Sequence, residues 1–363
     1  MKYKNFNKTA LFSILVTFAS VLLFNFIIDP YHAFNVFTIK GINTTKNHTV
    51  NHTMSKFHTA KLANPTVLLI GTSRTAHIHP LYLQKYFPDE IIYNLAIPGS
   101  GVSSQKNNIE YFIKHHNIKT IIYGLDFFAF NPVNNKFETK DKRYENDFTK
   151  DYMDSLLSVR TLRKSIKTLK DNIKNRDALL DYAIGWETYT SYYNEINKRG
   201  DIFIKENIQN ELNSLATQKN HFNYPPFKEP KSIINSLNAL EEIVKLCKDN
   251  NVELHMFISP IYSQIIDLIY ERGYDINYAH WKKELSTYET VYDFSGYNSI
   301  TQNISNYIDG SHYQTKLAAL MFAKIFDDNS IDVPDDFGTI LKTNTISSTV
   351  KKQSKKASQN VSK

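Results

Sequence analysis

Residues 66–71 read TVLLIG, a short apolar run bounded by Pro65 and a glycine turn. A run of this length without polar alternation is typical of a parallel strand that is buried on both faces. The residues that follow, Gly71-Thr72-Ser73-Arg74, place a serine in the turn that leaves the strand. In an open parallel sheet such turns lie at the carboxyl edge, where ligands bind. This stretch therefore predicts both the fold class and the part of the molecule where chemistry is expected.

Four later apolar runs repeat the pattern, and helices separate them. The runs are IIYNLAI at 91–97, TIIYGLDF at 120–127, VELHMFISP at 252–260 and TVYDFSG at 290–296. Helices are expected at 104–116, from Pro230 onward, and at 313–326. Strands that alternate with helices predict an α/β domain, in which an open parallel sheet is covered by helices on both faces.

An uncharged segment, Ala10 to Ile28, stands before the α/β pattern. As a helix it would rise roughly 28 Å, which is close to the thickness of a bilayer's hydrocarbon core. Three preceding lysines favour a cytoplasmic N-terminus, and Asp29-Pro30 ends the helix. A cleaved signal peptide is the alternative, but its apolar core is shorter, about 7–15 residues. We expect an uncleaved single-pass anchor in the cell membrane, with the main domain on the periplasmic or extracellular side.

The net charge of +7 is carried by the two ends of the chain. Three lysines precede the apolar segment and five lie beyond Val350. These eight lysines exceed the total by one, so the body of the chain has a net charge of −1. Composition therefore argues against a nucleic-acid-binding face. The single cysteine, Cys247, excludes an intrachain disulfide and a cysteine zinc cluster. No phosphate loop, dinucleotide fingerprint or metal signature is present, so no cofactor and no metal are expected.

These signals divide the chain into consecutive regions. They are an N-terminal tail at 1–9, a transmembrane anchor at 10–28, an irregular polar connector at 30–64, the first part of the α/β domain at 65–130, a mostly helical insertion at 131–227, the second part of the domain at 228–330, and a disordered basic tail at 343–363. The insertion leaves the top of the sheet, which makes it a candidate lid. One apolar helical stripe within it is interpreted as a docking face onto the main domain: Val159, Leu162, Ile166, Leu169 and Ile173.

Two short motifs could act together on a substrate. Ser73, at the carboxyl edge of the sheet, has a helix N-terminus behind it, where backbone N–H groups can stabilise an oxyanion. Near the other end of the chain, Asp309-Gly310-Ser311-His312 precedes the last expected helix. An aspartate three residues before a histidine can share one turn with it and orient the imidazole, which can then act as a base toward a serine.

Together the motifs resemble a known family. The strand followed by GTS, the segment YNLAIPG, the G-x-D after the third strand and the D-x-x-H before the last helix are similar to the blocks of the SGNH (GDSL-like) hydrolases. The closest likeness is to the membrane-anchored branch related to polysaccharide O-acetylation proteins and DltD-like proteins. The resemblance implies a three-layer α/β/α, flavodoxin-like fold.

The resemblance also implies a role for individual residues. Ser73 matches the nucleophile, His312 the general base and Asp309 its orienting acid, while the backbone N–H groups of Ser73 and Gly99 match the oxyanion hole. Two departures stand out: the first block reads Gly-Thr-Ser instead of Gly-Asp-Ser, and the third reads Gly-Leu-Asp instead of Gly-x-Asn. Asp126 therefore stands where the family has an amide donor.

A carboxylate at position 126 would repel a developing negative charge unless it is protonated or turned away. Loss of one oxyanion donor costs about 2.7–4 kcal/mol of transition-state stabilisation. Asp126 is alternatively a structural partner of Arg74, the residue after the nucleophile. Arg74 and His77 are candidates for the lining of the cleft.

The leading hypothesis is a membrane-anchored serine esterase or O-acyltransferase that acts on an acylated cell-surface glycan or polymer through an acyl-serine intermediate, with a membrane-bound acyltransferase as a candidate partner. The alternative is an inactive or weakly active accessory or binding protein of a cell-envelope acylation system, which the Asp126 departure motivates. Aromatic residues of the insertion either stack on a sugar ring or pack the insertion onto the domain: Trp186, Tyr189, Tyr192 and Tyr193.

Overall fold

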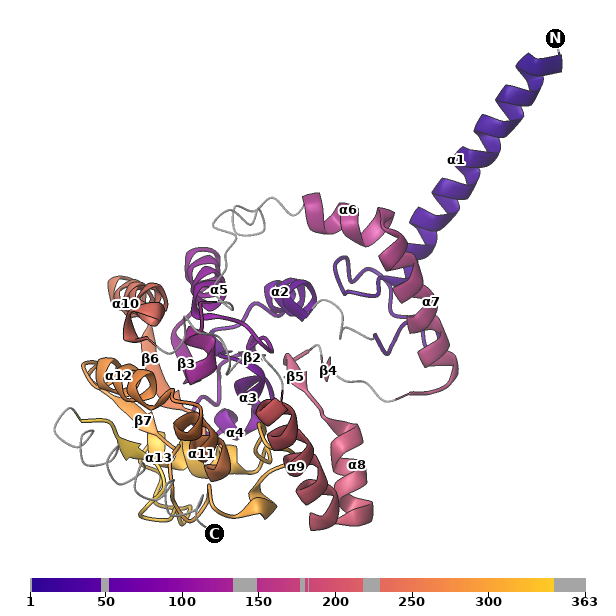
Figure 1. Ribbon diagram of the computed structural model, residues 1–363. Coiled ribbons are helices and arrows are strands. Elements are labelled where there is room, and N and C mark those ends of the chain that lie inside the picture. The colour runs from indigo at the N-terminus through magenta and orange to yellow at the C-terminus, as the bar shows by residue number, and fades with distance from the viewer. Residues whose placement is uncertain are drawn as a thin grey trace. The chain divides into compact units, whose positions relative to one another are not determined.

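A computed structural model describes residues 2–46, 52–132, 149–176, 180–181, 183–217 and 229–342. The chain divides into two compact units (Figure 1). The first comprises residues Met1–Leu62 and Thr139–Tyr182, and the second comprises Ala63–Glu138 and Ala183–Lys363. The expected insertion is thus shared between the units, because its first half belongs with the N-terminal segment and its second half with the α/β unit. The expected tail at 343–363 lies outside the described residues.

The second unit is built on a mostly parallel sheet with strand order β2-β1-β3-β6-β7-β8. The first five strands in this order are parallel, and β8 is antiparallel to β7. Strand bounds are β1 Val67–Ile70, β2 Ile92–Asn94, β3 Thr120–Leu125, β6 Glu253–Ile258, β7 Val291–Asp293 and β8 Thr339–Ile340. The five predicted strands are therefore confirmed. β8 was not predicted, since two exposed residues carry no periodic signal.

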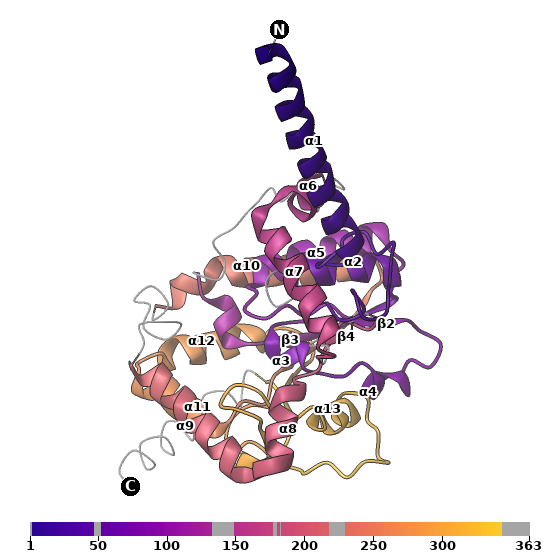
Figure 2. The ribbon, with the colours of Figure 1, turned by 90° about the vertical axis from the view of Figure 1, so that its right-hand side faces the viewer.

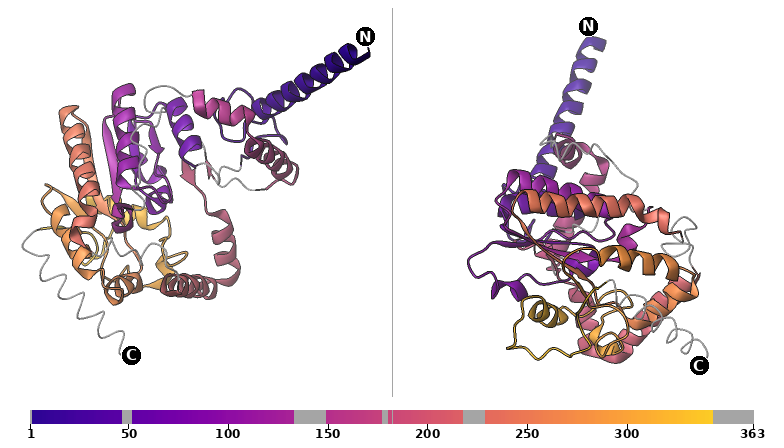
Figure 3. Two further views of the ribbon diagram at one scale, coloured as in Figure 1. Left: turned by 45° about the horizontal axis from the view of Figure 1, so that its top comes forward. Right: turned by 90° about the vertical axis from the view of Figure 1, so that its left-hand side faces the viewer.

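Helices cover both faces of this sheet (Figures 2 and 3), with α5, α10 and α12 on one face and α13 on the other. The predicted α/β class with a sheet between two helical layers is confirmed. The bounds in this unit are α3 Ser73–Ala76, α4 Leu81–Gln84, α5 Val102–His115, β5 Trp186–Glu187, α8 Thr190–Arg199, α9 Asp201–Thr217, α10 Ile234–Asp249, α11 Ser263–Glu271, α12 Asp275–Leu285 and α13 Leu317–Ile325, with 3-10 turns η1 Phe127–Phe130, η4 Pro230–Ile233 and η5 Ile304–Asn306.

The chain reverses its direction of travel across the sheet between β1 and β3. From β1 it passes to β2 on one side, then crosses back to β3 on the other side. The strand order matches the flavodoxin-like doubly wound pattern, in which the crevice at this switch point is the usual ligand site. Ser73 follows β1 and Asp126 follows β3, so both residues lie at the switch point.

The turn that carries Ser73 is held against the sheet by Thr75. The Thr75 side chain is fully buried. It fills the space left by two glycines, because a Cβ atom at either Gly71 or Gly124 would collide with its hydroxyl oxygen. At the other end of this one-turn helix, the Asn94 side-chain amide donates to the carbonyls of Thr75 and Ile78, each at 2.8 Å. β1, β2 and β3 thus all fix the position of α3.

The first unit contains the N-terminal helix. Its elements are α1 Lys2–Ile28, α2 His52–Ala63, α6 Thr149–Leu157, α7 Val159–Ile173 and β4 Leu180–Asp181. Within the described residues, one helix is long and apolar enough to cross a membrane, Asn5–Ile28. The connector is more ordered than its polar sequence predicts, because α2 occupies residues 52–63 and buries Met54, Phe57 and Ala60.

The end of α1 is capped by a buried carboxylate. Asp29 has a left-handed φ of 43°, which turns the chain out of the helix. Its carboxylate accepts hydrogen bonds from the backbone N–H groups of Ala33 at 2.8 Å and Asn35 at 2.8 Å. Lys46 pairs with it at 3.4 Å. Burial lowers the pKa of Lys46, although the Asp29 carboxylate opposes that shift. Asp29-Pro30, which the sequence predicts to end the helix, thus forms a buried, hydrogen-bonded turn at the end of α1.

Adding one methyl group at Gly124 tests this packing. We expect Gly124→Ala to destabilise the α/β unit by about 1–3 kcal/mol, because the new Cβ overlaps the Thr75 hydroxyl. The measurement is chemical denaturation of the full-length protein. The Thr75→Ala background lacks this hydroxyl, so Gly124→Ala should lower the free energy of unfolding by a smaller amount there. An equal loss of unfolding free energy in both backgrounds would contradict the proposed overlap between position 124 and Thr75.

Candidate active site

Ser73 is the first residue of α3, and its side chain is half-buried at the carboxyl edge of β1. The helix is a single turn, so the N-terminus expected behind Ser73 is short. Among the described residues, neither the Ser73 nor the Gly99 backbone N–H donates a hydrogen bond. Gly99 has a left-handed φ of 70° and open space where a side chain would stand. Both N–H groups are therefore available to an incoming ligand.

The D-x-x-H motif forms a tight loop before the last helix. Tyr307 and Tyr313 pair as an antiparallel bridge that closes the loop. Inside it, Asp309 accepts hydrogen bonds from the backbone N–H of Ser311 at 2.8 Å and of His312 at 2.7 Å. The ring Nδ1 of His312 lies 2.9 Å from both oxygens of the carboxylate. The expected pairing of Asp309 with His312 is present. The motif ends five residues before α13 begins at Leu317, so this helix starts later than the expected residue 313 and the motif does not open it.

The two partners alter each other's protonation. Burial opposes the charged form of His312, but the adjacent Asp309 carboxylate outweighs it and raises the pKa of the imidazole. Burial likewise opposes the charged form of Asp309. The His312 charge and three hydrogen bonds outweigh it and lower the pKa of that carboxyl. The carboxylate therefore stays ionised and keeps the Nδ1 proton of the imidazole directed toward itself.

Arg74 ties the Ser73 turn to the D-x-x-H loop. Its Nε donates to the Ser311 backbone carbonyl at 2.8 Å, and one Nη lies 3.3 Å from the Ser311 hydroxyl. The other Nη donates to the Asp126 carboxylate at 3.1 Å, and both side chains are buried. These contacts join residues that are 237 and 52 positions apart in the sequence. Ser73 and His312 are the sequence neighbours of the bonded residues, so this arginine brings the two motifs together.

Asp126 faces Arg74 and the hydroxyl of Thr72. Thr72 donates to one carboxylate oxygen and Arg74 to the other. Asp126 therefore acts as a partner of Arg74, which is the alternative that the sequence left open. Thr72, which stands where the first SGNH block has an aspartate, donates the other hydrogen bond to the Asp126 carboxylate. The two departures from the family pattern are thus joined in one hydrogen-bonded group.

A further carboxylate, Glu211, comes from the insertion and was not predicted. It lies on α9 one turn beyond Ile208, on the helix face that buries Ile204 and Ile208. Glu211 hydrogen-bonds the Ser311 side chain. Its Oε2 is so close to Gly310 that a Cβ there would stand 2.8 Å away. Burial and the Asp309 charge raise the pKa of Glu211. The sequence feature that could have identified Glu211 is its spacing, because this carboxylate continues an apolar stripe of the helix.

The aromatic residues of the insertion pack against three histidines of the α/β unit. The Tyr189 ring centroid lies 4.6 Å from that of His77 and 5.3 Å from that of His312. The Tyr193 hydroxyl is 3.0 Å from the His77 Nε2, and the Trp186 ring contacts the His79 ring at 4.2 Å. Of the two interpretations of these aromatic residues, the contacts support packing of the insertion onto the domain.

The two cleft candidates, Arg74 and His77, are both buried. Burial, together with the nearby His312, lowers the pKa of His77 to about 3, so this imidazole is neutral. Sequence reasoning had placed these two side chains on the wall of a cleft. The structure gives them partners inside the unit instead.

The Ser73 hydroxyl and the His312 ring are not hydrogen-bonded. His312 Nε2 is buried and, among the described residues, has no hydrogen-bond partner. The structure thus forms the acid–imidazole pair and holds it near the serine turn, while the last contact of a triad stays open. Such contacts are often long without a ligand and tighten when substrate binds. Within the described residues, no group of three or more His, Cys, Asp or Glu side chains could hold a metal ion.

A comparison with protein families matches residues 9–319 to the family described as "Protein of unknown function (DUF1574)". The chain belongs to this family. The matched span includes α1, the Ser73 turn, the insertion and the Asp309–His312 loop. In a separate search, no curated protein matches the chain. The description of this family names no activity.

Removing the Arg74 guanidinium tests its bridging role. We expect Arg74→Met to destabilise the α/β unit by about 3–5 kcal/mol, because it leaves the Asp126 carboxylate buried without its charged partner. The double variant Arg74→Met/Asp126→Asn removes that isolated charge and should recover part of the loss. Denaturation of the full-length variants measures both. A double variant less stable than Arg74→Met alone would contradict the assignment.

Proposed function

We propose that this protein is a serine esterase or O-acyltransferase that works through an acyl-serine intermediate. The observation that carries the proposal is the Arg74–Ser311 contact, which holds the Ser73 turn beside the Asp309–His312 pair at the switch point of the sheet. A nucleophile, a base and an orienting acid are the three parts that acyl transfer requires. The resemblance to the SGNH hydrolases in the same residues supports this choice of chemistry.

In the proposed first step, the Ser73 hydroxyl attacks the carbonyl carbon of an ester. His312 Nε2 accepts the hydroxyl proton as the new C–O bond forms, and Asp309 holds the imidazole through Nδ1. The backbone N–H groups of Ser73 and Gly99 donate to the oxyanion. When the tetrahedral intermediate collapses, the C–O bond to the alcohol breaks, and His312 returns the proton to that alcohol. An acyl-serine remains.

The second step reverses the first with a new acceptor. Water or a sugar hydroxyl gives its proton to His312 and attacks the acyl-serine, and Ser73 is released with the proton that His312 returns. Both steps require the Ser73 hydroxyl and His312 Nε2 to meet. Because Nε2 is buried and Tyr189 lies over the ring, substrate binding has to bring these two groups together.

We propose that α1 anchors the protein in a membrane as a single span. Its length, its apolar composition and its exposure support this assignment. The three lysines that precede the apolar segment favour a cytoplasmic N-terminus, which would place both units on the periplasmic or extracellular side. The substrate that suits this location and the family resemblance is an acylated cell-surface glycan or polymer, and a membrane-bound acyltransferase is the corresponding partner.

A binding or accessory role is the second candidate. The observation in its favour is Asp126, since a carboxylate bonded to Arg74 and Thr72 supplies no amide donor to an oxyanion. In this version the same fold holds an acylated glycan for another enzyme, and Ser73 does no chemistry.

A fluorophosphonate probe separates the two candidates. It reports the nucleophile without a known substrate, because it forms a covalent bond only with an activated serine. We expect the folded full-length protein to be labelled at Ser73 and Ser73→Ala to lose the label. Ser330→Ala, at an exposed serine far along the chain, is the matched control and should label normally. Mass spectrometry locates the modified residue. A folded protein without a label on Ser73 would favour the accessory role.

The pH dependence of labelling tests the base. Only neutral His312 can accept the serine proton, and Asp309 raises the pKa of this imidazole. The labelling rate should therefore rise with pH through a midpoint above 6.5, the ordinary value. Asp309→Asn should lower both the midpoint and the rate, because Asp309 raises the pKa of His312 through its charge and a hydrogen bond. Glu211→Gln should lower the midpoint by less, because Glu211 acts through its charge alone. A midpoint that neither variant moves would exclude His312 as the base.

A further inference from the structure

Helix α7 packs with its polar side inward. Its buried residues are Thr161, Ser165, Thr168, Asp171 and Asn172. Ser165 donates to the Asn25 side chain of α1 at 2.8 Å, and Asn172 accepts from the Thr45 backbone N–H at 2.9 Å. Hydrogen bonds, rather than apolar contacts, thus fix this helix to its unit.

The apolar stripe of α7 is left largely uncovered. Val159 is 67% exposed, Ile166 41% and Ile173 66%, while Leu162 and Leu169 are half-buried. The sequence interpreted this stripe as a docking face, but the structure uses the polar side for packing. An amphipathic helix normally buries its apolar stripe against its own protein. The stripe of α7 is therefore open to an apolar partner outside its own unit.

A row of cations runs along α7 directly beside the apolar stripe. With about 3.6 residues per turn, its members fall on one neighbouring face of the helix: Arg160, Arg163, Lys164, Lys167, Lys170 and Lys174. Arg163, Lys167, Lys170 and Lys174 line a shallow depression of about 240 Å³, which Ile166, Asp171 and Arg176 complete. Asp171 is paired with Arg176 at 3.1 Å. Burial and the neighbouring positive charges of Lys167 and Arg160 lower the pKa of Lys164, so an anion here would relieve repulsion.

The position of α7 along α1 places both stripes near the end of the apolar span. Asn25, which bonds Ser165, lies three residues before Ile28, or about 4.5 Å along the helix. Asn25 also donates to the Leu156 carbonyl at the end of α6. Figures 1 and 2 show α6 and α7 gathered at this end of α1. The middle of α7 is therefore level with the surface of any bilayer that α1 crosses.

Other apolar surface lies along α1 and on the connector that follows it. An open groove of about 420 Å³ runs between the middle of α1 and the end of α6, and its lining includes Ile14, Phe18, Val21 and Leu157. On the connector, Val36 is 57% exposed and Phe37 is 42% exposed, with the Phe37 ring 6.0 Å from that of Phe26. Uncovered apolar side chains thus extend from the span of α1 to the connector beyond its end.

We propose that α7 is a membrane-surface helix, whose apolar stripe enters the bilayer edge beside α1 and whose basic stripe binds the phosphate groups of anionic phospholipids. Apolar and basic faces side by side are the pattern of interfacial helices, and each lysine or arginine near an anionic surface adds to the attraction. The long lysine and arginine side chains can reach the headgroups while their stems lie in the apolar layer. This inference rests on the proposed membrane anchor and is independent of the proposed chemistry.

Three fluorescent labels on the full-length protein in nanodiscs test the position of α7. Each is placed on a new cysteine, Leu15→Cys in α1, Val159→Cys in α7 or Ile276→Cys in the other unit, and all three sites are exposed. The native Cys247 competes little, because it is buried and burial raises the pKa of its thiol to about 12. The nanodiscs contain lipids with a quencher on the acyl chain.

We expect quenching at positions 15 and 159 and weak quenching at 276. Quenching at 15 without quenching at 159 would overturn the inference and leave the anchor intact. Absence of quenching at 15 would overturn the anchor, and the inference with it.

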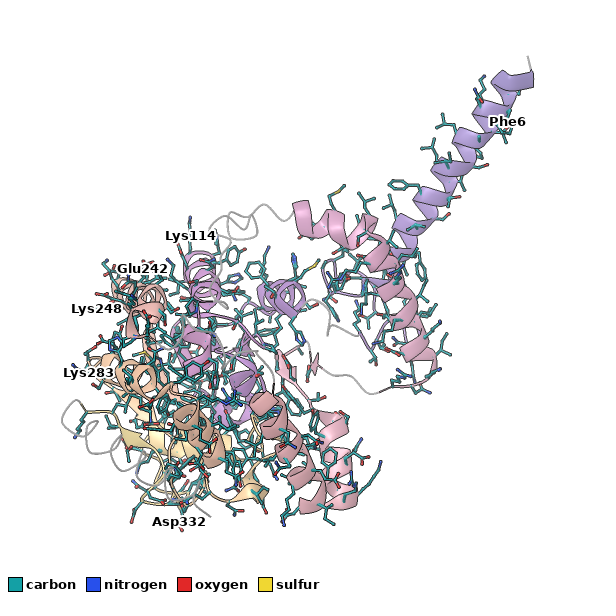
Figure 4. The ribbon with its side chains drawn as sticks, viewed as in Figure 1. Phe6, Lys114, Glu242, Lys248, Lys283 and Asp332 are labelled. Carbon is teal, nitrogen blue, oxygen red and sulfur yellow. The ribbon has the colours of Figure 1, made fainter. Side chains whose placement is uncertain are left out.

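The charge requirement is tested by native mass spectrometry of lipid retained by the full-length protein, from nanodiscs of phosphatidylcholine mixed equally with phosphatidylglycerol. The test variant neutralises four basic residues of α7: Arg163→Gln, Lys167→Gln, Lys170→Gln and Lys174→Gln. The matched control neutralises four exposed lysines of the other unit, three of them labelled in Figure 4: Lys114→Gln, Lys205→Gln, Lys248→Gln and Lys283→Gln.

We expect the native protein and the control to retain phosphatidylglycerol in preference to phosphatidylcholine, and the α7 variant to lose at least about tenfold in that affinity. Equal retention of the two lipids by the native protein would overturn the proposal. So would unchanged retention by the α7 variant, or a dimer whose second copy covers Val159 and excludes lipid.

Discussion

One guanidinium group holds the candidate site together. Arg74 contacts the turn after β1, the end of β3 and the D-x-x-H loop, and the last of these comes 237 residues later in the chain. Its planar donors reach a carbonyl, a hydroxyl and a carboxylate in separate directions at once, which a lysine ammonium on a flexible stem would not reproduce. Its bonds add to other links between the two segments, such as the hydrogen bond from the His79 N–H to the Thr315 hydroxyl at 3.3 Å.

The same interaction explains why position 126 carries a carboxylate. A buried guanidinium needs a counter-charge, and the end of β3 lies beside the Ser73 turn because β3 pairs with β1. An amide there would donate to an oxyanion but leave Arg74 unpaired. Arg74, Asp126 and Thr72 are therefore best understood as one unit. If the site is catalytic, its oxyanion donors have to come from the backbone.

The sequence predicts those parts of the site that depend on local pattern. Apolar runs of four to six residues identify β1 and β3, and three-residue spacing is sufficient to foresee the Asp309–His312 pair. Contacts between distant segments leave no such pattern, so neither the Arg74–Ser311 bond nor the approach of Glu211 to the loop could be predicted. Within its own unit, α7 buries its polar side, which the sequence did not predict, and there is a physical reason. Periodicity shows that a helix has an apolar side, but it does not show whether protein or another apolar phase covers that side.

The insertion completes both units, and this has a consequence for how the protein is organised. After β3 the chain runs to α6 and α7, which bond the end of α1 through Asn25, and it returns as α8 and α9, which bring Tyr189 and Glu211 to the candidate site. The two halves of the insertion thus do different work. The first half is fixed to α1 by hydrogen bonds, and the second half brings an aromatic ring and a carboxylate to the Asp309–His312 pair. One continuous insertion after β3 therefore contributes packing to two separate compact units, because the chain passes through both of them.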